Sequence, residues 1–169
     1  MKRKILSVAV AVMCVALSAC SSNENNEVKD GNDSGVQAIS NAAPSEVTSA
    51  ILVEIPINSA IEKGIDDLSV YFTELDTATL ESASYYMCAS GAYPDEIAVF
   101  KFTSEELAEQ GMSAVQARLD KQISVYESYT PDEMYKLDGA VIEKSGSYVY
   151  YLVTSDNEKA KGIAEGFLG

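Results

Sequence analysis

The stretch from residue 84 to residue 126 constrains the fold more than any other part of the chain. Two short apolar runs, 84–89 and 96–102, are typical of strands, and turn-forming residues separate them. A helix is expected next, because apolar side chains then recur at steps of three or four residues. Thr103 and Glu106 have the spacing of a capping box at its start. The stretch therefore predicts two strands followed by a long helix that buries one stripe.

The same order of elements is predicted a second time near the C-terminus. Residues 140–143 and 147–153 are typical of a hairpin, and a helix is expected after Ser155. A helix is also predicted near the start of the domain, from Ser45. The fold class predicted is α+β: an antiparallel sheet with helices packed on one face, a strand–strand–helix pattern occurring twice, and a preceding N-terminal helix. Each of the two predicted strand–helix junctions carries a Thr-Ser pair, Thr103-Ser104 and Thr154-Ser155. An internal duplication would explain this repeat, and so would independent helix capping.

The N-terminus has the order of a secretory signal. Residues 2–4 are basic and residues 5–17 are uncharged and apolar. That run is shorter than the roughly 17–25 residues of a spanning helix. Leu17-Ser18-Ala19-Cys20 resembles a lipobox, the processing site of bacterial lipoproteins. We expect cleavage between Ala19 and Cys20 and a diacylglycerol on the Cys20 thiol. Two acyl chains hold a protein stably on a bilayer, whereas one does so only marginally.

Three regions follow from this pattern. Residues 1–19 are predicted to be the signal peptide, and residues 20–44 the lipidated cysteine and a disordered acidic tether of low apolar content. Residues 45–169 are predicted to form a single globular α+β domain. The expected location is the extracytoplasmic face of the cell membrane, where the protein is lipid-anchored.

The charge balance restricts the partners. The chain has 12 Lys and Arg against 26 Asp and Glu, a net charge of −14, and loss of the three basic signal residues makes it −17. Nucleic acid and anionic lipid repel such a surface. The partners predicted are the membrane, through the lipid on Cys20, and an envelope protein or a cell-wall component, with no nucleic acid.

Histidine is absent from the chain, which excludes Ser-His-Asp triads, Cys-His pairs and His-containing zinc sites. No metal site, cofactor or catalytic residue is predicted. Cys88 is the one cysteine left in the predicted domain, so no disulfide forms within it. Its apolar strand neighbours favour a buried, structural thiol over a reactive one.

A partner-contact face is predicted from five residues: Tyr93, Asp95, Glu96, Tyr148 and Tyr150. The first three belong to a turn, where binding residues often lie. Tyr148 and Tyr150 share one face of a strand, and exposed tyrosines suit the centre of an interface. Asp95 and Glu96 are expected to be solvated, with Arg118 as an ion-pair partner. The competing interpretation makes the two strand tyrosines core residues.

Several of these motifs together resemble a known family. The lipobox and acidic tether, then residues 95–101 (Asp-Glu-Ile-Ala-Val-Phe-Lys), Arg118-Leu119, residues 129–131 (Tyr-Thr-Pro) and residues 146–149 (Gly-Ser-Tyr-Val) are similar to the small lipoproteins of domain-of-unknown-function family 4358. The resemblance covers about residues 45–168 and implies a Gram-positive cell surface. It implies no activity.

Three functions are compatible with the sequence. The favoured one is a membrane-anchored lipoprotein that acts as a non-enzymatic binding or docking module at the cell envelope. The alternatives are a small-ligand or cation-binding accessory protein and a histidine-independent, carboxylate-based envelope hydrolase. A deep pocket with two facing carboxylates would favour the hydrolase.

Overall fold

The computed structural model describes residues 41–169. The predictions for the signal peptide, Cys20 and residues 20–40 of the tether lie outside the described residues. None of the helices that residues 41–169 form has the length and apolar content needed to cross a membrane.

The described chain is α+β, as predicted, and its N-terminal helix is present. The elements, in chain order, are α1 (Pro44–Glu54), β1 (Ala60–Lys63), η1 (Ile65–Asp67), α2 (Leu68–Tyr71), η2 (Thr77–Thr79), β2 (Leu80–Cys88), β3 (Glu96–Phe102), α3 (Glu105–Tyr129), η3 (Pro131–Glu133), α4 (Met134–Asp138), β4 (Val141–Ser145), β5 (Tyr148–Val153) and α5 (Asn157–Leu168).

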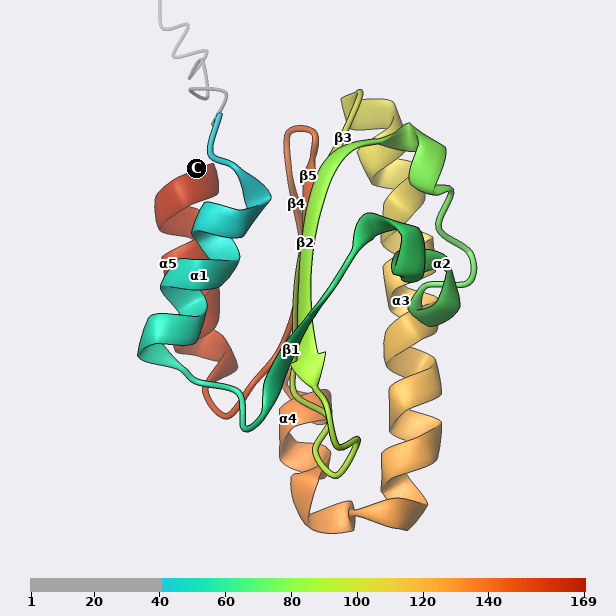
Figure 1. The fold of residues 1–169 in the computed structure, drawn as a ribbon, viewed down its shortest axis with the longest axis vertical. Coiled ribbons are helices and arrows are strands. Elements are labelled where there is room, and N and C mark those ends of the chain that lie inside the picture. The colour runs from blue at the N-terminus through green and yellow to red at the C-terminus, as the bar shows by residue number, and fades with distance from the viewer. Residues whose placement is uncertain (1–40) are drawn as a thin grey trace, which may run out of the picture. The chain divides into compact units, whose positions relative to one another are not determined.

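The five strands form one antiparallel sheet in the order β1-β2-β3-β5-β4 (Figure 1). The two predicted hairpins, β2–β3 and β4–β5, meet along β3 and β5 at the centre. In that pairing Glu96 lies opposite Val153 at one end, and Lys101 lies opposite Tyr148 at the other. Residues at opposite ends of β3 and β5, such as Glu96 and Lys101, therefore lie at opposite ends of the sheet.

Helices cover both faces of the sheet, so the prediction of helices on one face is wrong. α1 and α5 lie on one side, and α2 and α3 lie on the other (Figure 1). Helices are needed on both faces because every residue of the central strand β5 is buried. Tyr148, Tyr150 and Leu152 pack toward α1 and α5, whereas Val149, Tyr151 and Val153 pack toward α3. A strand that is apolar on both faces needs a helical layer on each.

The strand–strand–helix pattern occurs twice, as β2-β3-α3 and β4-β5-α5, but the two helices pack on opposite faces. The shared Thr-Ser junction therefore does not lead to equivalent packing. Each helix begins with its own cap: the Ser104 side chain accepts from the Leu107 N–H, and the Asp156 side chain accepts from the Lys159 N–H. The cap of α3 is the serine of its Thr-Ser pair, one residue after the predicted Thr103, whereas the cap of α5 is the residue that follows Thr154-Ser155, so the two junctions are capped at different positions.

Candidate functional site

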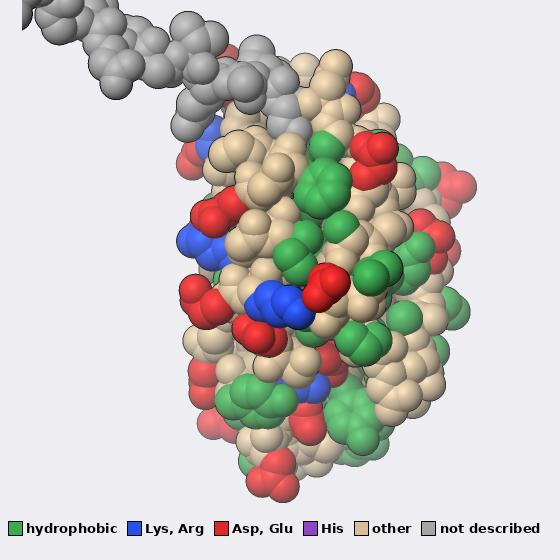
Figure 2. Space-filling model, turned by 90° about the vertical axis from the view of Figure 1, so that its left-hand side faces the viewer, with side chains coloured by type: hydrophobic (Ala, Val, Ile, Leu, Met, Phe, Trp, Pro, Cys, Tyr) green, Lys and Arg blue, Asp and Glu red, His purple; other side chains and the backbone are tan. Residues whose placement is uncertain are grey.

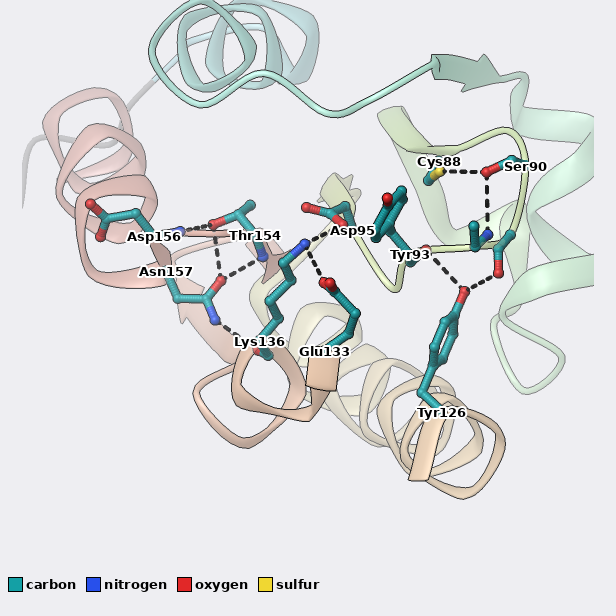
Figure 3. A network of polar contacts seen from close by, with 12 residues as sticks. Cys88, Ser90, Tyr93, Asp95, Tyr126, Glu133, Lys136, Thr154, Asp156 and Asn157 are labelled. Carbon is teal, nitrogen blue, oxygen red and sulfur yellow. Dashed lines mark hydrogen bonds and ion pairs between the residues drawn. The ribbon is translucent and has the colours of Figure 1, made fainter. Parts of the chain in front are cut away.

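The turn between β2 and β3 is held by a tyrosine from the long helix. The Tyr126 hydroxyl lies 2.9 Å from the carbonyl oxygens of both Gly91 and Tyr93, and its proton is donated toward them (Figure 3). Gly91 has a φ of 64°, a conformation that glycine adopts without strain. Burial, followed by the charge of Glu96, raises the pKa of Tyr126 to about 12. The turn is thereby fixed against the last turn of α3.

Asp95 is joined to the short helix α4 by a buried lysine. The Lys136 Nζ lies 2.7 Å from a carboxylate oxygen of Asp95 and 2.7 Å from one of Glu133 (Figure 3). Burial works to lower the pKa of Lys136, but the hydrogen bonds to these two carboxylates outweigh it and raise that pKa. The same ammonium lies 5.4 Å from the ring centroid of Tyr93 and 5.9 Å from that of Tyr135. Two carboxylates and two aromatic rings thus surround one cation.

Asn157 fixes this arrangement from the other side. Its side-chain nitrogen donates to the Lys136 carbonyl at 2.8 Å, and its side-chain oxygen accepts from the Thr154 N–H at 2.7 Å (Figure 3). Asn157 is the first residue of α5, so α4 is tied to the junction of β5 and α5. The backbone of Lys136 is therefore fixed by a side chain from α5.

Glu96 forms a second ion pair, inside the core beneath α3. Arg118 Nε donates to Glu96 Oε2 at 3.1 Å, Arg118 Nη2 donates to Oε1, and Gln122 Nε2 donates to Oε1 at 2.8 Å. Glu96 is 1 % exposed and Arg118 8 %. Burial raises the pKa of Glu96, and Arg118 opposes that rise. Arginine keeps its proton in a folded protein, and both oxygens of Glu96 act as acceptors of N–H groups from Arg118 and Gln122.

The structure does not bring the predicted contact residues together on one surface. Asp95 and Glu96 are buried in ion pairs, so the expectation that they are solvated is wrong, although the predicted pairing with Arg118 is present. Tyr148 and Tyr150 are each 2 % exposed, so they cannot serve as surface anchors. Of the five, only Tyr93 is exposed, at 38 %. The helices α1 and α5 cover the sheet face on which an exposed tyrosine pair was expected.

Tyr148 and Tyr150 have local structural partners instead. The Tyr148 hydroxyl donates to the Ala42 carbonyl at 2.9 Å and holds the start of the described chain against the sheet. The Tyr150 hydroxyl donates to Glu143 Oε2 at 2.6 Å on the neighbouring strand β4. These contacts agree with the competing interpretation, in which both are core residues. They also lie toward the end of β5 that is remote from Tyr93.

Two exposed tyrosines that were not among the predicted contact residues lie at the same end of the fold as Tyr93 (Figure 1). Tyr129, at the end of α3, is 66 % exposed, and Tyr135, on α4, is 57 % exposed. Tyr135 shares Lys136 with Tyr93, and the Tyr129 ring lies 6.4 Å from the Tyr126 ring that holds the turn. We call Tyr93, Tyr129 and Tyr135 the tyrosine end. Sequence spacing does not mark Tyr129 as exposed, because it follows Tyr126 by three residues and so continues the spacing of the buried stripe.

The match to a family model covers residues 58–154, whose description is Domain of unknown function (DUF4358). The chain belongs to this family. The DUF4358 segment includes both buried ion pairs and the tyrosine end, and it leaves out α1 and α5. No curated protein and no solved structure matches the chain.

Cys88 lies within the DUF4358 segment, next to the turn. It is 1 % exposed, which confirms the predicted burial. Its Sγ lies 3.2 Å from the Ser90 hydroxyl (Figure 3). Burial works to raise the pKa of the thiol, but hydrogen bonds with Ser90 and with the Tyr93 backbone outweigh it and lower that pKa. The lowering comes from local hydrogen bonds, since no cation is among its causes.

A small cavity of about 220 Å³ lies elsewhere in the DUF4358 segment, between the loop before β2 and the helix α3. Its lining residues are Glu74, Leu75, Asp76, Thr79, Phe102, Leu107, Gln110 and Gly111. The volume is below the roughly 300–1,000 Å³ of ordinary small-molecule pockets. Within residues 41–169 no three Asp, Glu or Cys side chains gather as a set of metal ligands. The cavity thus offers two carboxylates and little enclosed volume.

Proposed function

We propose that the chain is a lipid-anchored, extracytoplasmic docking module that binds a partner at the cell envelope through its tyrosine end. The anchor is proposed from the basic, apolar and lipobox order that ends at Cys20. The docking role is proposed from the exposure of Tyr93, Tyr129 and Tyr135 on a rigid base. Tyrosines that project from a fixed scaffold lose little conformational entropy on binding and are frequent interface anchors.

The rigid base is the observation that carries this proposal. The backbone of Tyr93 is held by Tyr126, Tyr135 is held beside Lys136, and Lys136 is held by Asp95, Glu133 and Asn157. The contacts made by Tyr126, Asp95 and Asn157 join segments far apart in the sequence, whereas Glu133 and Tyr135 are local neighbours of Lys136. The backbone that carries Tyr93 and Tyr135 is thus fixed by this network, and the Tyr129 ring packs edge-on against Tyr126, so little freedom remains to be lost on binding.

The position of the tyrosine end also supports the proposal. The described chain begins beside the end of α5, whereas α4 and the β2–β3 turn lie at the opposite end of the sheet (Figure 1). The helix α3 connects the two ends, and its 25 residues span about 37 Å. A partner bound at the tyrosine end would therefore not contact the point at which the described chain begins.

A photo-crosslinking experiment tests the docking role. A photoreactive amino acid in place of Tyr129 should give a crosslinked adduct in native membranes, and that adduct should disappear when Tyr93 and Tyr135 are also changed to Ala. The matched control is the same amino acid at Val53, which is 79 % exposed on α1. Equal crosslinking from both positions would contradict a specific contact at the tyrosine end.

The small-ligand or cation-binding alternative has one observation in its favour, the cavity bounded by Glu74 and Asp76. If a divalent cation binds there, calcium should raise the melting temperature, and Asp76→Asn should abolish that rise. The carboxylate hydrolase gains no support from Asp95 and Glu96, because each carboxylate is paired with its own cation and buried. A glycosidase pair needs two carboxyl groups that face a shared substrate.

A further inference from the structure

We infer that the partner of the tyrosine end is a cationic peptide segment, rich in lysine or arginine, rather than a neutral glycan. This inference rests on the proposed docking function and names its partner class. Its first support is the charge of the two segments that form this end, residues 89–95 and 125–139. They contain Asp95, Glu127, Asp132, Glu133 and Asp138, against Lys136 as their one cation.

That single lysine is already neutralised. Its ammonium is 2.7 Å from both Asp95 and Glu133, and the residue is only 7 % exposed. The remaining carboxylates, Glu127, Asp132 and Asp138, are exposed on α3, η3 and α4. The tyrosine end thus presents exposed aromatic rings among carboxylates that lack a local cation within those two segments. Figure 2 shows hydrophobic and acidic side chains next to one another at the lower end of the α1–α5 side.

The second support is that this end already holds an ammonium of its own. Lys136 Nζ lies within 6 Å of the rings of Tyr93 and Tyr135 while it pairs with two carboxylates. Cations are attracted to the faces of aromatic rings at this range, and nearby carboxylates add to that attraction. An incoming lysine or arginine would meet both kinds of group at this end, where the rings of Tyr129 and Tyr135 and the carboxylates of Glu127, Asp132 and Asp138 are all exposed.

Charge complementarity also separates the candidate partners. Anionic wall polymers and anionic lipid would be repelled by this end, and a neutral glycan would gain only from stacking on the rings. A basic segment gains from both the rings and the carboxylates, and its association would be accelerated by the acidic surface. The chemistry of the exposed groups therefore favours a basic peptide.

The test uses the full-length lipidated protein in a non-ionic detergent and a fluorescent decapeptide of alternating lysine and glycine. Fluorescence anisotropy should show binding that weakens with added salt. A peptide with glutamine in place of lysine should not bind. Tyr129→Ala with Tyr135→Ala should weaken binding about five- to tenfold, whereas the corresponding phenylalanine pair should retain it, because the ring face is preserved. Unchanged melting temperatures would show that these variants remain folded.

A charge-matched pair of variants separates a local site from the general acidity of the protein. Asp132→Asn at the tyrosine end should weaken binding about two- to threefold. Asp66→Asn removes the same charge from an exposed position on η1 and should leave binding unchanged. Equal effects from the two variants, together with no effect of the tyrosine changes, would overturn the inference.

The remaining outcomes distinguish this inference from the docking role on which it rests. Equal binding of the glutamine peptide would overturn the cationic partner and leave a tyrosine platform for neutral ligands. Absence of binding by either peptide would also overturn the inference, even if the crosslink at Tyr129 still forms. Absence of that crosslink would instead contradict the docking role itself.

Discussion

Arg118 and Glu96 join the long helix to the central strand of the sheet, with Arg118 Nε 3.1 Å from Glu96 Oε2 and both side chains buried. Glu96→Ala would leave the guanidinium in the core without a counter-charge, at a cost of about 3–5 kcal/mol. The double variant Glu96→Leu with Arg118→Met should lose less than Glu96→Ala alone. Urea unfolding measures the free energy of unfolding of the two variants. If the double variant is less stable than Glu96→Ala, this account of the ion pair is contradicted.

Tyr126→Phe removes the hydroxyl that lies 2.9 Å from the Gly91 and Tyr93 carbonyls. We expect a loss of about 1–2 kcal/mol in the free energy of unfolding, because two carbonyls lose a donor. Hydrogen exchange should rise at residues 91–93. If exchange in this turn stays unchanged while stability falls, Tyr126 does not hold the turn.

The same tyrosine gives a pH dependence. The pKa of Tyr126 is about 12 in the folded protein, above the roughly 10 of an unfolded chain. Its proton is therefore bound more tightly in the folded state, so its contribution to stability is complete below pH 10 and is lost as the pH rises from about 10 to about 12. Tyr126→Phe should make the fall in stability over that range less steep. A slope identical to that of the wild type would contradict the shift.

Tyr148→Ala and Tyr150→Ala should each reduce the free energy of unfolding by about 3–5 kcal/mol, because both rings are buried between the sheet and the α1–α5 layer. Tyr129→Ala, at a ring that is 66 % exposed, should change it by no more than about 0.5 kcal/mol. Thermal or urea unfolding separates the two groups. Similar losses at all three positions would contradict the assignment of core and surface tyrosines.

Gly111→Ala should destabilise the protein, although alanine is the better helix former. A Cβ at this position would lie 2.2 Å from Cζ of Phe102, so the ring or the helix must move, at a cost of about 1–3 kcal/mol. Gly162→Ala is the matched control, because nothing lies within 4 Å of its added Cβ. That change in α5 should stabilise by about 0.5–1 kcal/mol. Stabilisation by both substitutions would contradict the close contact between α3 and β3.

Gly111 also shows how far the sequence alone predicts this fold. The periodicity of α3 identified its buried stripe and its approximate length, but it gave Gly111 no role, because a contact with Phe102 depends on how closely the helix approaches the sheet. β1 was not predicted, for a different reason. Its residues are exposed or half-buried at every position, so they lack the alternation that marks a strand.

The candidate site was less predictable than the fold. Local signals marked residues 93–96 as a turn, but ion pairing with Lys136 and Arg118 depends on packing between α4, α3 and β3. Tyr148 and Tyr150 were correctly placed on one face of a strand. Whether that face is exposed depended on α1 and α5, two helices that meet through contacts such as Lys159 with Glu54, which are 105 residues apart in the sequence. Local patterns predict orientation, whereas burial depends on the whole fold.

Metabolic labelling with a fatty-acid analogue tests the proposal of a lipid-anchored protein most directly. The wild type should incorporate the label and remain in the membrane fraction, because Cys20 ends the Leu-Ser-Ala-Cys motif. Cys88→Ser, at the buried thiol, is the matched control and should keep both the label and the location. Cys20→Ser should lose the label and leave the membrane fraction or accumulate as an unprocessed precursor. A Cys20→Ser protein that is still labelled and processed would contradict the proposal.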